Sequence, residues 1–485
     1  MPVRQTIARN AAYLFASNFL VRFITACATI LLARYLGAES YGALSVALAW
    51  AAIAGYFTDM GLTQTLIREG TKPSPDLPNL MGGAFKLRLL FAAGTTAACG
   101  LFIVVLYPDP LLRGTVALVV IPTIWGGAMQ GIGAAYFQMT QQMQYIALIR
   151  IVSGLCTAAV LGIGILWHWP LHVVALAYGV SSLLGGGLSV MLTLRRVPYC
   201  WGWHRGLLEG LGHFTLGGLL IMILPQLGPL VLERVAGLQQ VGYFAAASRF
   251  PSVLYQIPGV LAAAFYPQLF HYGARDMKLH LRLSVRELKC MSLLATGMAL
   301  PFALYAEWVV RYLLGPRWVG VASTTLAILA WIVILQGINY PLADALTTQG
   351  LQARRSRVLL LAAAIGVGCY AWWGARWGAP GAAMAAVAVE MTLLIGCAVA
   401  NPSGWPLLRR GVFGGWRALG IPAVFVIALR YCLPWQGIGV VITPLLYFAG
   451  ALLLDEEARH YVREWIVRQQ TRTTRQMAAP VGAEE

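Results

Sequence analysis

Long apolar runs separated by short polar connectors dominate this sequence. No Asp, Glu, Lys or Arg occurs in the runs 114–149, 151–194, 250–274, 318–343 and 431–454. A helix needs roughly 20 predominantly apolar residues to cross the hydrocarbon core of a bilayer, so each run holds one or two spans. The pattern predicts about fourteen membrane helices, at residues 11–34, 42–64, 82–106, 114–136, 144–167, 171–194, 213–233, 241–268, 288–311, 323–349, 357–374, 380–400, 413–430 and 436–454.

Positive charges are distributed unevenly about these predicted helices. Of the 35 Lys and Arg residues, seven fall in the connectors of one side, three fall within spans and the remaining 25 fall on the other side. Cytoplasmic loops of membrane proteins carry the excess of Lys and Arg, so both termini are predicted to be cytoplasmic. The predicted fold class is an all-α polytopic membrane protein with about fourteen transmembrane helices.

Composition excludes several other classes of protein. Only 11% of the residues are charged and 59% are hydrophobic, whereas a soluble domain carries roughly 25% charged residues. A soluble enzyme and a disordered chain are therefore excluded. The net charge of +17 does not indicate a nucleic-acid partner, because the cations punctuate apolar runs instead of clustering on one face of a soluble module.

Motifs for catalysis and cofactor binding are missing from the sequence. It has no Gly-Lys dipeptide, hence no Walker A loop, and neither HExxH nor GxSxG occurs. The eight cysteines form no CxxC pair, and we interpret them as small apolar residues in helix packing. No predicted connector exceeds roughly 20 residues, which leaves no extramembrane domain for a catalytic centre. We expect no enzymatic activity, no cofactor and no metal.

One internal repeat is visible at an offset of 200 residues. Its members are Leu32, Arg34, Gly37 and Gly42, which recur as Leu232, Arg234, Gly237 and Gly242. Six predicted helices separate the copies, so both halves insert with the same orientation, and this predicts two lobes related by an axis along the membrane normal. We divide the chain into an N-terminal lobe (1–205), a C-terminal lobe (206–405), two further helices (406–454) and a cytoplasmic amphipathic helix with a tail (455–485).

Three basic residues lie within the predicted spans. Ionisable groups at this depth are costly and suggest function by default. Arg22 lies near the middle of the first helix, and we favour a cation that faces a cavity over half of a structural ion pair. For Arg249 both interpretations stay open. Arg150 is a candidate for gating, but it can reach the cytoplasmic headgroups, and we favour that interpretation. The same holds for Lys86 and Arg88, which are counted with the cytoplasmic cations.

Three acidic residues also lie within spans. Asp59 can pair with Arg22 or Arg150, or cap a break before Gly61, and we favour a packing role over ion coupling or gating. Asp344 and Glu390 can bind a proton or Na⁺, or pair with arginines, and the sequence does not separate these alternatives.

Prolines interrupt the predicted helices of the second half. Pro225, Pro229 and Pro258 are the candidate hinges, because proline removes a backbone hydrogen bond and bends a helix. The alternative is that prolines are ordinary in membrane helices.

Several motifs resemble those of the Wzx-type oligosaccharide flippases, the polysaccharide transporters of the multidrug/oligosaccharidyl-lipid/polysaccharide exporter superfamily. They are Ala33-Arg34-Tyr35-Leu36-Gly37 with Tyr41-Gly42, Asp59-Met60-Gly61-Leu62 with Arg68-Glu69, Val241-Gly242-Tyr243-Phe244 with Arg249, Leu314-Gly315, and Gly378-Ala379-Pro380-Gly381. The resemblance runs from about residue 4 to residue 401 and rests on the order of these motifs along the chain.

The resemblance implies two six-helix lobes around a central cavity that opens alternately to each side. It implies a flippase that moves undecaprenyl-diphosphate-linked oligosaccharide from the cytoplasmic to the periplasmic leaflet of the bacterial inner membrane, for surface polysaccharide synthesis. A polysaccharide polymerase and glycosyltransferases of the same pathway are the implied partners. Arg22 and Arg249 are expected to meet the diphosphate, and Asn18, Gln226, Gln256 and Asn339 to meet the sugars.

Two alternatives stay open, and a third is disfavoured. A multidrug exporter of the same superfamily takes cationic substrates and is expected to have an acidic cavity, whereas the in-span charges here are three basic and three acidic. A lipid II flippase of the superfamily fits nearly as well. A membrane-embedded polymerase or ligase is expected to need a longer outer loop than any predicted here.

Overall fold

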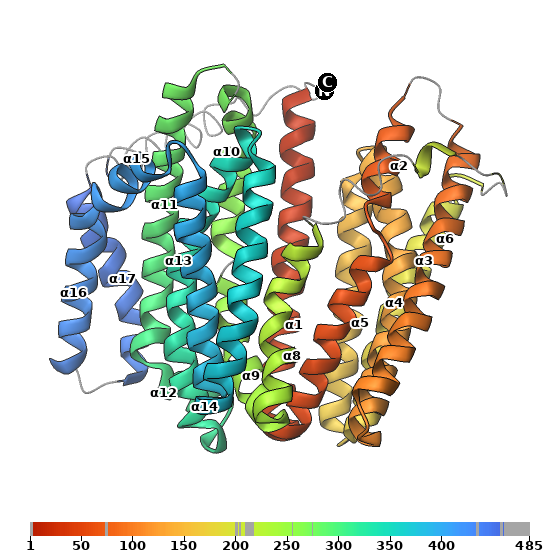
Figure 1. The fold of residues 1–485 in the computed structure, drawn as a ribbon, viewed down its shortest axis with the longest axis horizontal. Coiled ribbons are helices and arrows are strands. Elements are labelled where there is room, and N and C mark those ends of the chain that lie inside the picture. The colour runs from red at the N-terminus through yellow and green to blue at the C-terminus, as the bar shows by residue number, and fades with distance from the viewer. Residues whose placement is uncertain are drawn as a thin grey trace, which may run out of the picture.

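The computed structural model describes residues 3–72, 76–198, 202, 205–208, 218–254, 256–273, 275–432, 436–455 and 459. In these residues the chain is helical throughout and has no strand (Figure 1). Ten of the described helices are long and apolar enough to cross a membrane, or eleven if the bent pair Gly404–Phe413 and Trp416–Arg430 is one span. The all-α, multi-pass fold is therefore confirmed, while the count of fourteen helices stays a prediction.

The first half of the chain forms a bundle that we call the first lobe. Its helices are α1 (Val3–Phe57), α2 (Leu62–Gly70), α3 (Leu77–Leu106), α4 (Pro110–Met139), α5 (Met143–Leu166) and α6 (Leu171–Leu194), followed by the short turn η1 (Arg205–Leu207). Helices α4 and α6 pack along their length, and α1 packs on α5. Asp76 and Asp109 cap α3 and α4 through their carboxylates, which fixes where these two spans begin.

The second half forms a matching bundle, the second lobe. It contains η2 (Leu224–Gln226), α8 (Leu227–Ala236), α9 (Leu238–Leu254), α10 (Gln256–Gly273), α11 (Met277–Leu304), α12 (Ala306–Leu313), η3 (Pro316–Trp318), α13 (Val321–Thr348) and α14 (Gln352–Ala400). Helices α11 and α14 both pack against α13. In Figure 1 the first lobe lies on the right and the second lobe on the left, and α1 and α9 join them at the centre.

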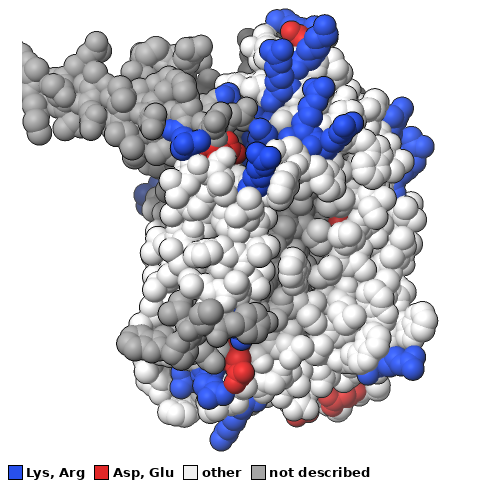
Figure 2. All heavy atoms as spheres, turned by 90° about the vertical axis from the view of Figure 1, so that its left-hand side faces the viewer, with Lys and Arg blue, Asp and Glu red and all other residues white. Residues whose placement is uncertain are grey.

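Two further helices lie at the edge of the second lobe. After α15 (Gly404–Leu408) and the π-helical turn η4 (Arg409–Phe413), α16 (Trp416–Cys432) and α17 (Gln436–Leu454) form an antiparallel pair on α11. Figure 2 views the molecule from this edge: Lys and Arg gather at the upper end, where α1 begins, and the broad band below them is almost entirely uncharged. This band matches the surface that a bilayer covers. Of the predicted amphipathic helix and tail (455–485), all but Asp455 and Arg459 lie outside the described residues.

The predicted helix boundaries differ from the structure in several places. Helices predicted at 11–34 and 42–64 correspond to the two arms of α1, which turns at the non-helical Gly37, and those at 357–374 and 380–400 correspond to the two arms of α14, which turns at Gly378. The helix predicted at 241–268 corresponds to α9 and α10, which lie on either side of residue 255, outside the described residues. Helix α11 begins eleven residues before the predicted 288, because Asp276 caps it and its first turns carry charged residues that hydropathy assigns to a loop.

The internal repeat is confirmed in three dimensions. Gly37 has φ 79° and ψ 171°, and Gly237 has φ 84° and ψ 170°, so the chain turns in the same left-handed conformation at both copies. A Cβ on Gly42 would collide with the carbonyl oxygen of Leu238, and one on Gly242 with that of Ala38. Each contact joins a glycine of one copy of the repeat to a carbonyl oxygen of the other copy, so exchanging the two lobes turns one contact into the other. A pseudo-two-fold axis produces this relation. We call this the reciprocal glycine contact, and its side of the molecule the connector side.

Candidate substrate cavity

A cavity of about 430 Å³ lies between the two lobes. Helices α1, α4, α5 and α6 line it from the first lobe and α9 lines it from the second. Its polar lining consists of Asn18, Arg22, Thr25, Thr29, Gln130, Arg150, Ser153, Thr157, Tyr178, Arg249 and Ser252. Three of these residues are arginines and none is an acid, so the cavity is suited to an anion.

Two of the arginines belong to the first lobe. Asn18 and Arg22 lie one helical turn apart on α1, and Arg150 of α5 donates a hydrogen bond from Nη1 to Asn18 Oδ1 over 2.7 Å. Our preference for Arg150 at the cytoplasmic headgroups was wrong, because its side chain lines the cavity. Among the described residues, Arg22 forms no ion pair, so its cavity position agrees with the interpretation that we favoured.

The third arginine connects the lobes. Arg249 lies on α9, and its Nε donates to the hydroxyl of Tyr41, on the second half of α1, over 3.1 Å. Tyr41 is fully buried and meets Trp318 edge to face, with ring centroids 6.4 Å apart. Arg249 is therefore both a cavity cation and a contact across the boundary between the lobes, next to the reciprocal glycine contact.

Asp59 has a different partner from the two that we predicted. It pairs with Arg88 of α3 and accepts hydrogen bonds from the backbone N–H of Thr63 at 3.2 Å and from its hydroxyl at 2.5 Å. It therefore caps α2 after the break at Met60, whose φ is 41°. Arg88 is only 2% exposed, so our interpretation of it as a headgroup-facing residue was wrong. Neither residue lines the cavity.

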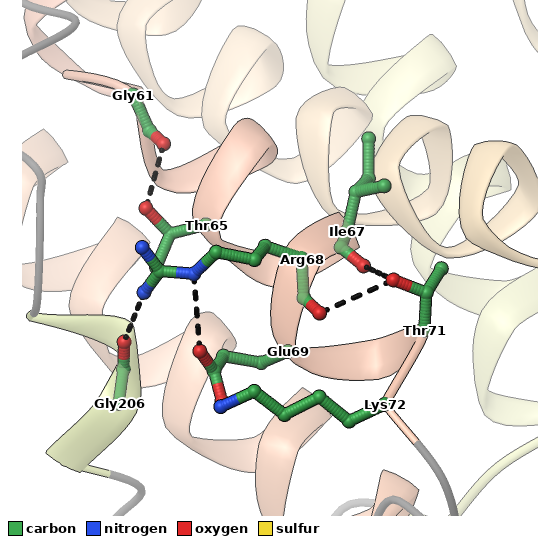
Figure 3. A network of polar contacts seen from close by, with 8 residues as sticks. All are labelled: Gly61, Thr65, Ile67, Arg68, Glu69, Thr71, Lys72 and Gly206. Carbon is green, nitrogen blue, oxygen red and sulfur yellow. Dashed lines mark hydrogen bonds and ion pairs between the residues drawn. The ribbon is translucent and has the colours of Figure 1, made fainter.

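A second polar network ties α2 to the segment that joins the lobes (Figure 3). Glu69, which is 4% exposed, accepts from Arg68 Nε over 3.1 Å and from Lys72 Nζ over 2.5 Å. Arg68 also donates from Nη2 to the carbonyl oxygen of Gly206 over 3.2 Å. The Arg68-Glu69 motif thus holds the turn η1 against the end of α2.

The remaining predicted sugar ligands are not in the cavity. Asn339 is 8% exposed on α13, and its amide donates to the Glu390 carboxylate over 2.7 Å and to the Glu390 carbonyl over 2.9 Å. Gln336 donates to the same carboxylate over 2.8 Å, so two amides hold Glu390 inside the second lobe. Of the two alternatives left open for Glu390, pairing with arginine is not found among the described residues. Gln226 does not line the cavity, and the Gln256 amide donates to the carbonyl of Ser252.

Two of the three candidate hinges lie at an interruption of regular helix: Pro225 is inside the 3-10 turn η2, and Pro229 is in the first turn of α8, which follows it. Pro258 lies within the helical residues of α10. Their role as hinges stays a prediction.

Sequence reasoning missed most of the uncharged polar lining. Gln130, Ser153, Thr157 and Tyr178 lie in uncharged runs whose hydropathy hides single polar groups. Gln130 donates to Ser182 O over 3.1 Å and lies 3.3 Å from Ser153 Oγ, which joins α4, α5 and α6 on one wall. The one sequence feature that could have indicated this wall is Gln130, an isolated polar residue within an apolar run.

Comparison with solved structures places the fold among membrane transporters. The lipid II flippase MurJ in an inward closed conformation superposes with a TM-score of 0.74 at 13% sequence identity, covering 93% of this chain and 99% of that one. An inward-facing multidrug resistance MATE family transporter of the MOP superfamily gives a TM-score of 0.65 at 14% identity, covering 80% of this chain and 96% of that one. These likenesses concern the fold alone.

Sequence comparison gives the family. The chain belongs to the polysaccharide biosynthesis protein family, whose sequence profile matches residues 7–272. A putative O-antigen transporter of Shigella flexneri is 20% identical over 315 residues, which cover 59% of this chain and 72% of that protein. The resemblance drawn from the motifs is thereby confirmed, and the relatives and structural neighbours are transporters or flippases.

Proposed function

We propose that this protein flips undecaprenyl-diphosphate-linked oligosaccharide from the cytoplasmic to the periplasmic leaflet of a bacterial inner membrane, for synthesis of a surface polysaccharide. The observation that carries the proposal is the cavity between the lobes, whose lining among the described residues contains Arg22, Arg150 and Arg249 and no acid. The family match and the O-antigen transporter relative support the same substrate class.

The cavity fits the part of such a substrate that a bilayer excludes most strongly. A diphosphate cannot enter hydrocarbon uncompensated, and arginine offers it two parallel charge-assisted hydrogen bonds. The hydroxyls and amides of Thr25, Gln130, Ser153 and Thr157 can bind sugar hydroxyls. A volume of about 430 Å³ lies within the roughly 300–1,000 Å³ of ordinary ligand sites, so the cavity takes the diphosphate and the first sugars rather than a whole oligosaccharide.

The proposed transport path follows from the two-lobe architecture. The lobes, divided near residues 205 and 405, rock against each other about an axis in the membrane plane so that the cavity opens alternately to each side, and Pro225, Pro229 and Pro258 serve as bending points. The lipid tail stays in the bilayer through a portal beside α1 and α9. Both termini are cytoplasmic, and a polysaccharide polymerase and glycosyltransferases act before and after the flip.

One of the two alternatives predicts a different cavity charge. A multidrug exporter for cations needs acidic lining, which the described cavity does not have. A lipid II flippase carries a diphosphate too, so cavity charge does not separate it from our proposal. The family match favours polysaccharide synthesis.

Deletion of the gene tests the proposal. We expect lipid-linked oligosaccharide to accumulate in the cytoplasmic leaflet and surface polysaccharide to disappear, and both defects to be reversed by a plasmid copy. Normal surface polysaccharide in a deletion strain that has no second flippase would overturn the assignment. Peptidoglycan arrest with normal oligosaccharide distribution would identify a lipid II flippase instead.

A further inference from the structure

The second lobe contains a carboxylate that burial leaves without a partner. Glu287 of α11 is 0% exposed, and neither of its carboxylate oxygens has a hydrogen-bond partner. Ser284, one turn earlier on the same helix, is 1% exposed, and its hydroxyl oxygen also has no partner. Buried polar atoms without partners are rare in native proteins and call for a water, an ion or a proton.

A second carboxylate lies opposite this pair. Helices α11 and α13 pack antiparallel: His280 Nε2 lies 2.8 Å from Thr348 Oγ1, and Gly337 packs against Met291 and Ala295. This register brings the turn with Ser284 and Glu287 beside Asp344, which is 8% exposed and interacts electrostatically with Glu287. Three oxygen-bearing side chains from two helices therefore meet in a buried space.

The surrounding charges do not neutralise two carboxylates. Around the pair, α13 contributes Asp344, α14 contributes Arg355, which interacts with Asp344, and α10 contributes Tyr266. On α11 itself His280 is buried, whereas Lys278, Arg282 and Arg286 are exposed and Lys289 is partly exposed. The other elements packed against α11 contribute the exposed Glu307 and Arg311 of α12, Arg409 and Arg410 of η4 and Arg417 and Arg430 of α16, and the buried Tyr447 of α17. Two carboxylates against one cation leave one negative charge in a buried site, which is strongly unfavourable.

We propose that Glu287 and Asp344 share one exchangeable proton, so that the second lobe contains a proton-binding site separate from the arginine-lined cavity. One proton cancels the excess charge. It also supplies the donor that the site lacks, and α13 offers acceptors in the Asp344 carboxylate and in the Gly337 carbonyl, which Pro341 leaves without its helical N–H. No residue of α11 or α13 lines the cavity, so the site does not overlap with the proposed substrate site.

Infrared spectroscopy of the purified protein in lipid nanodiscs tests the proposal directly. Titration from neutral to alkaline pH should remove one carbonyl band of a protonated carboxyl group, identified by its shift in D₂O. The band should be absent from Glu287→Gln and present in Glu307→Gln, the matched control, whose carboxylate is exposed and paired with Arg311. A band that persists unchanged in Glu287→Gln overturns the proposal.

Thermal unfolding supplies a second readout. The protonated carboxyl group is the form compatible with burial, so the Tm of the wild type should fall as pH rises through the alkaline range. Glutamine mimics the protonated acid, so Glu287→Gln should lose this dependence, while equal pH dependence in both proteins contradicts the proposal. If Glu287→Gln does not accumulate in the membrane, Asp344→Asn replaces it as the test variant. Asp344→Asn should lose the carboxyl band at a lower pH than the wild type does. A band that titrates at the same pH in both proteins overturns the proposal.

Sodium is the alternative ligand for this site, and one further comparison of Tm values distinguishes it from a proton. A Tm that rises with NaCl but not with equal choline chloride, and only when Glu287 is present, identifies a Na⁺ site and overturns the proton site. None of these measurements uses a transported substrate, so their failure leaves the flippase proposal untouched.

Discussion

Arginine side chains inside the membrane have opposite environments in this protein. Arg22 faces the cavity without an ion pair among the described residues, while Arg88 is buried against Asp59 and Thr63. Hydropathy identifies both as cations near or within spans, yet it cannot say which helix face each occupies. Arg22 lines the cavity, as its central depth predicts, while its role as a substrate ligand stays a prediction. The interpretation of Arg88 failed because its partner comes from a helix break.

Substitution of Arg22 separates ligand binding from stability. Arg22→Ala should leave the protein abundant and abolish transport, and Arg22→Lys should retain part of it, because the charge survives while the two-pronged hydrogen bonding is lost. Protein abundance and surface polysaccharide in the complemented deletion strain measure the two effects. Arg357→Ala, which removes an exposed cation, is the control. A drop in abundance for Arg22→Ala that matches its loss of transport would show a structural role.

Substitution of Arg88 should give the reverse pattern. Arg88→Ala leaves Asp59 without its ion-pair partner, and breaking a buried pair costs about 3–5 kcal/mol, so we expect a large loss of folded protein. Asp59→Asn in the same chain should restore part of the abundance, since it removes the unpaired charge. Detergent-solubilised protein measured by size-exclusion chromatography reports the amounts, and an additive loss in the double variant would contradict the pairing.

At the scale of helices, hydropathy located the spans but not their ends or turns. Helix α6 matches the prediction at Leu171–Leu194, because Pro170 and Arg195 bound its apolar run. Helix α11 does not, since its first turns carry Lys278, Arg282 and Arg286 and continue the helix beyond the apolar segment. The error mattered for function: it placed Glu287 in a predicted loop and hid the buried carboxylate.

The reciprocal glycine contact predicts that a larger side chain at Gly42 keeps α1 and α9 apart. Gly42→Leu should prevent the lobes from closing on the connector side, because the added side chain collides with the Leu238 carbonyl. A cysteine at Asn18, in a background without native cysteines, should then react faster with an impermeant thiol reagent added from outside. Gly55→Leu is the control, because nothing lies within 4 Å of its Cβ position on the same helix. Equal reactivity in the two variants would show that the contact does not close this side.

At the scale of the whole molecule, the sequence repeat predicted the symmetry and the charge asymmetry predicted the orientation. The repeat could be recognised because its turn requires left-handed backbone at Gly37 and Gly237, which few residues tolerate. The cavity could not be outlined, because its walls combine five helices and no local pattern encodes which faces meet.

The orientation is tested by labelling. Cysteines introduced at Glu39, Asp109 and Arg376 should react with an impermeant thiol reagent in intact cells, because they lie in connectors on the cation-poor side. Cysteines at Lys72, Arg282 and Arg355 should react only after the membrane is opened. External labelling at Arg282 would refute the proposed topology.

The reciprocal glycine contact joins backbone to backbone, and this affects what each transport cycle demands. A seal built from long side chains must freeze their rotamers at every closure, at about 0.5–1.5 kcal/mol for each rotamer-rich side chain immobilised. Gly42 and Gly242 have no rotamers to freeze, and the carbonyls they meet are already fixed by their helices. The two halves of the protein can therefore part and rejoin repeatedly with almost no entropic penalty at this point of contact, which suits a seal that must be remade in every cycle.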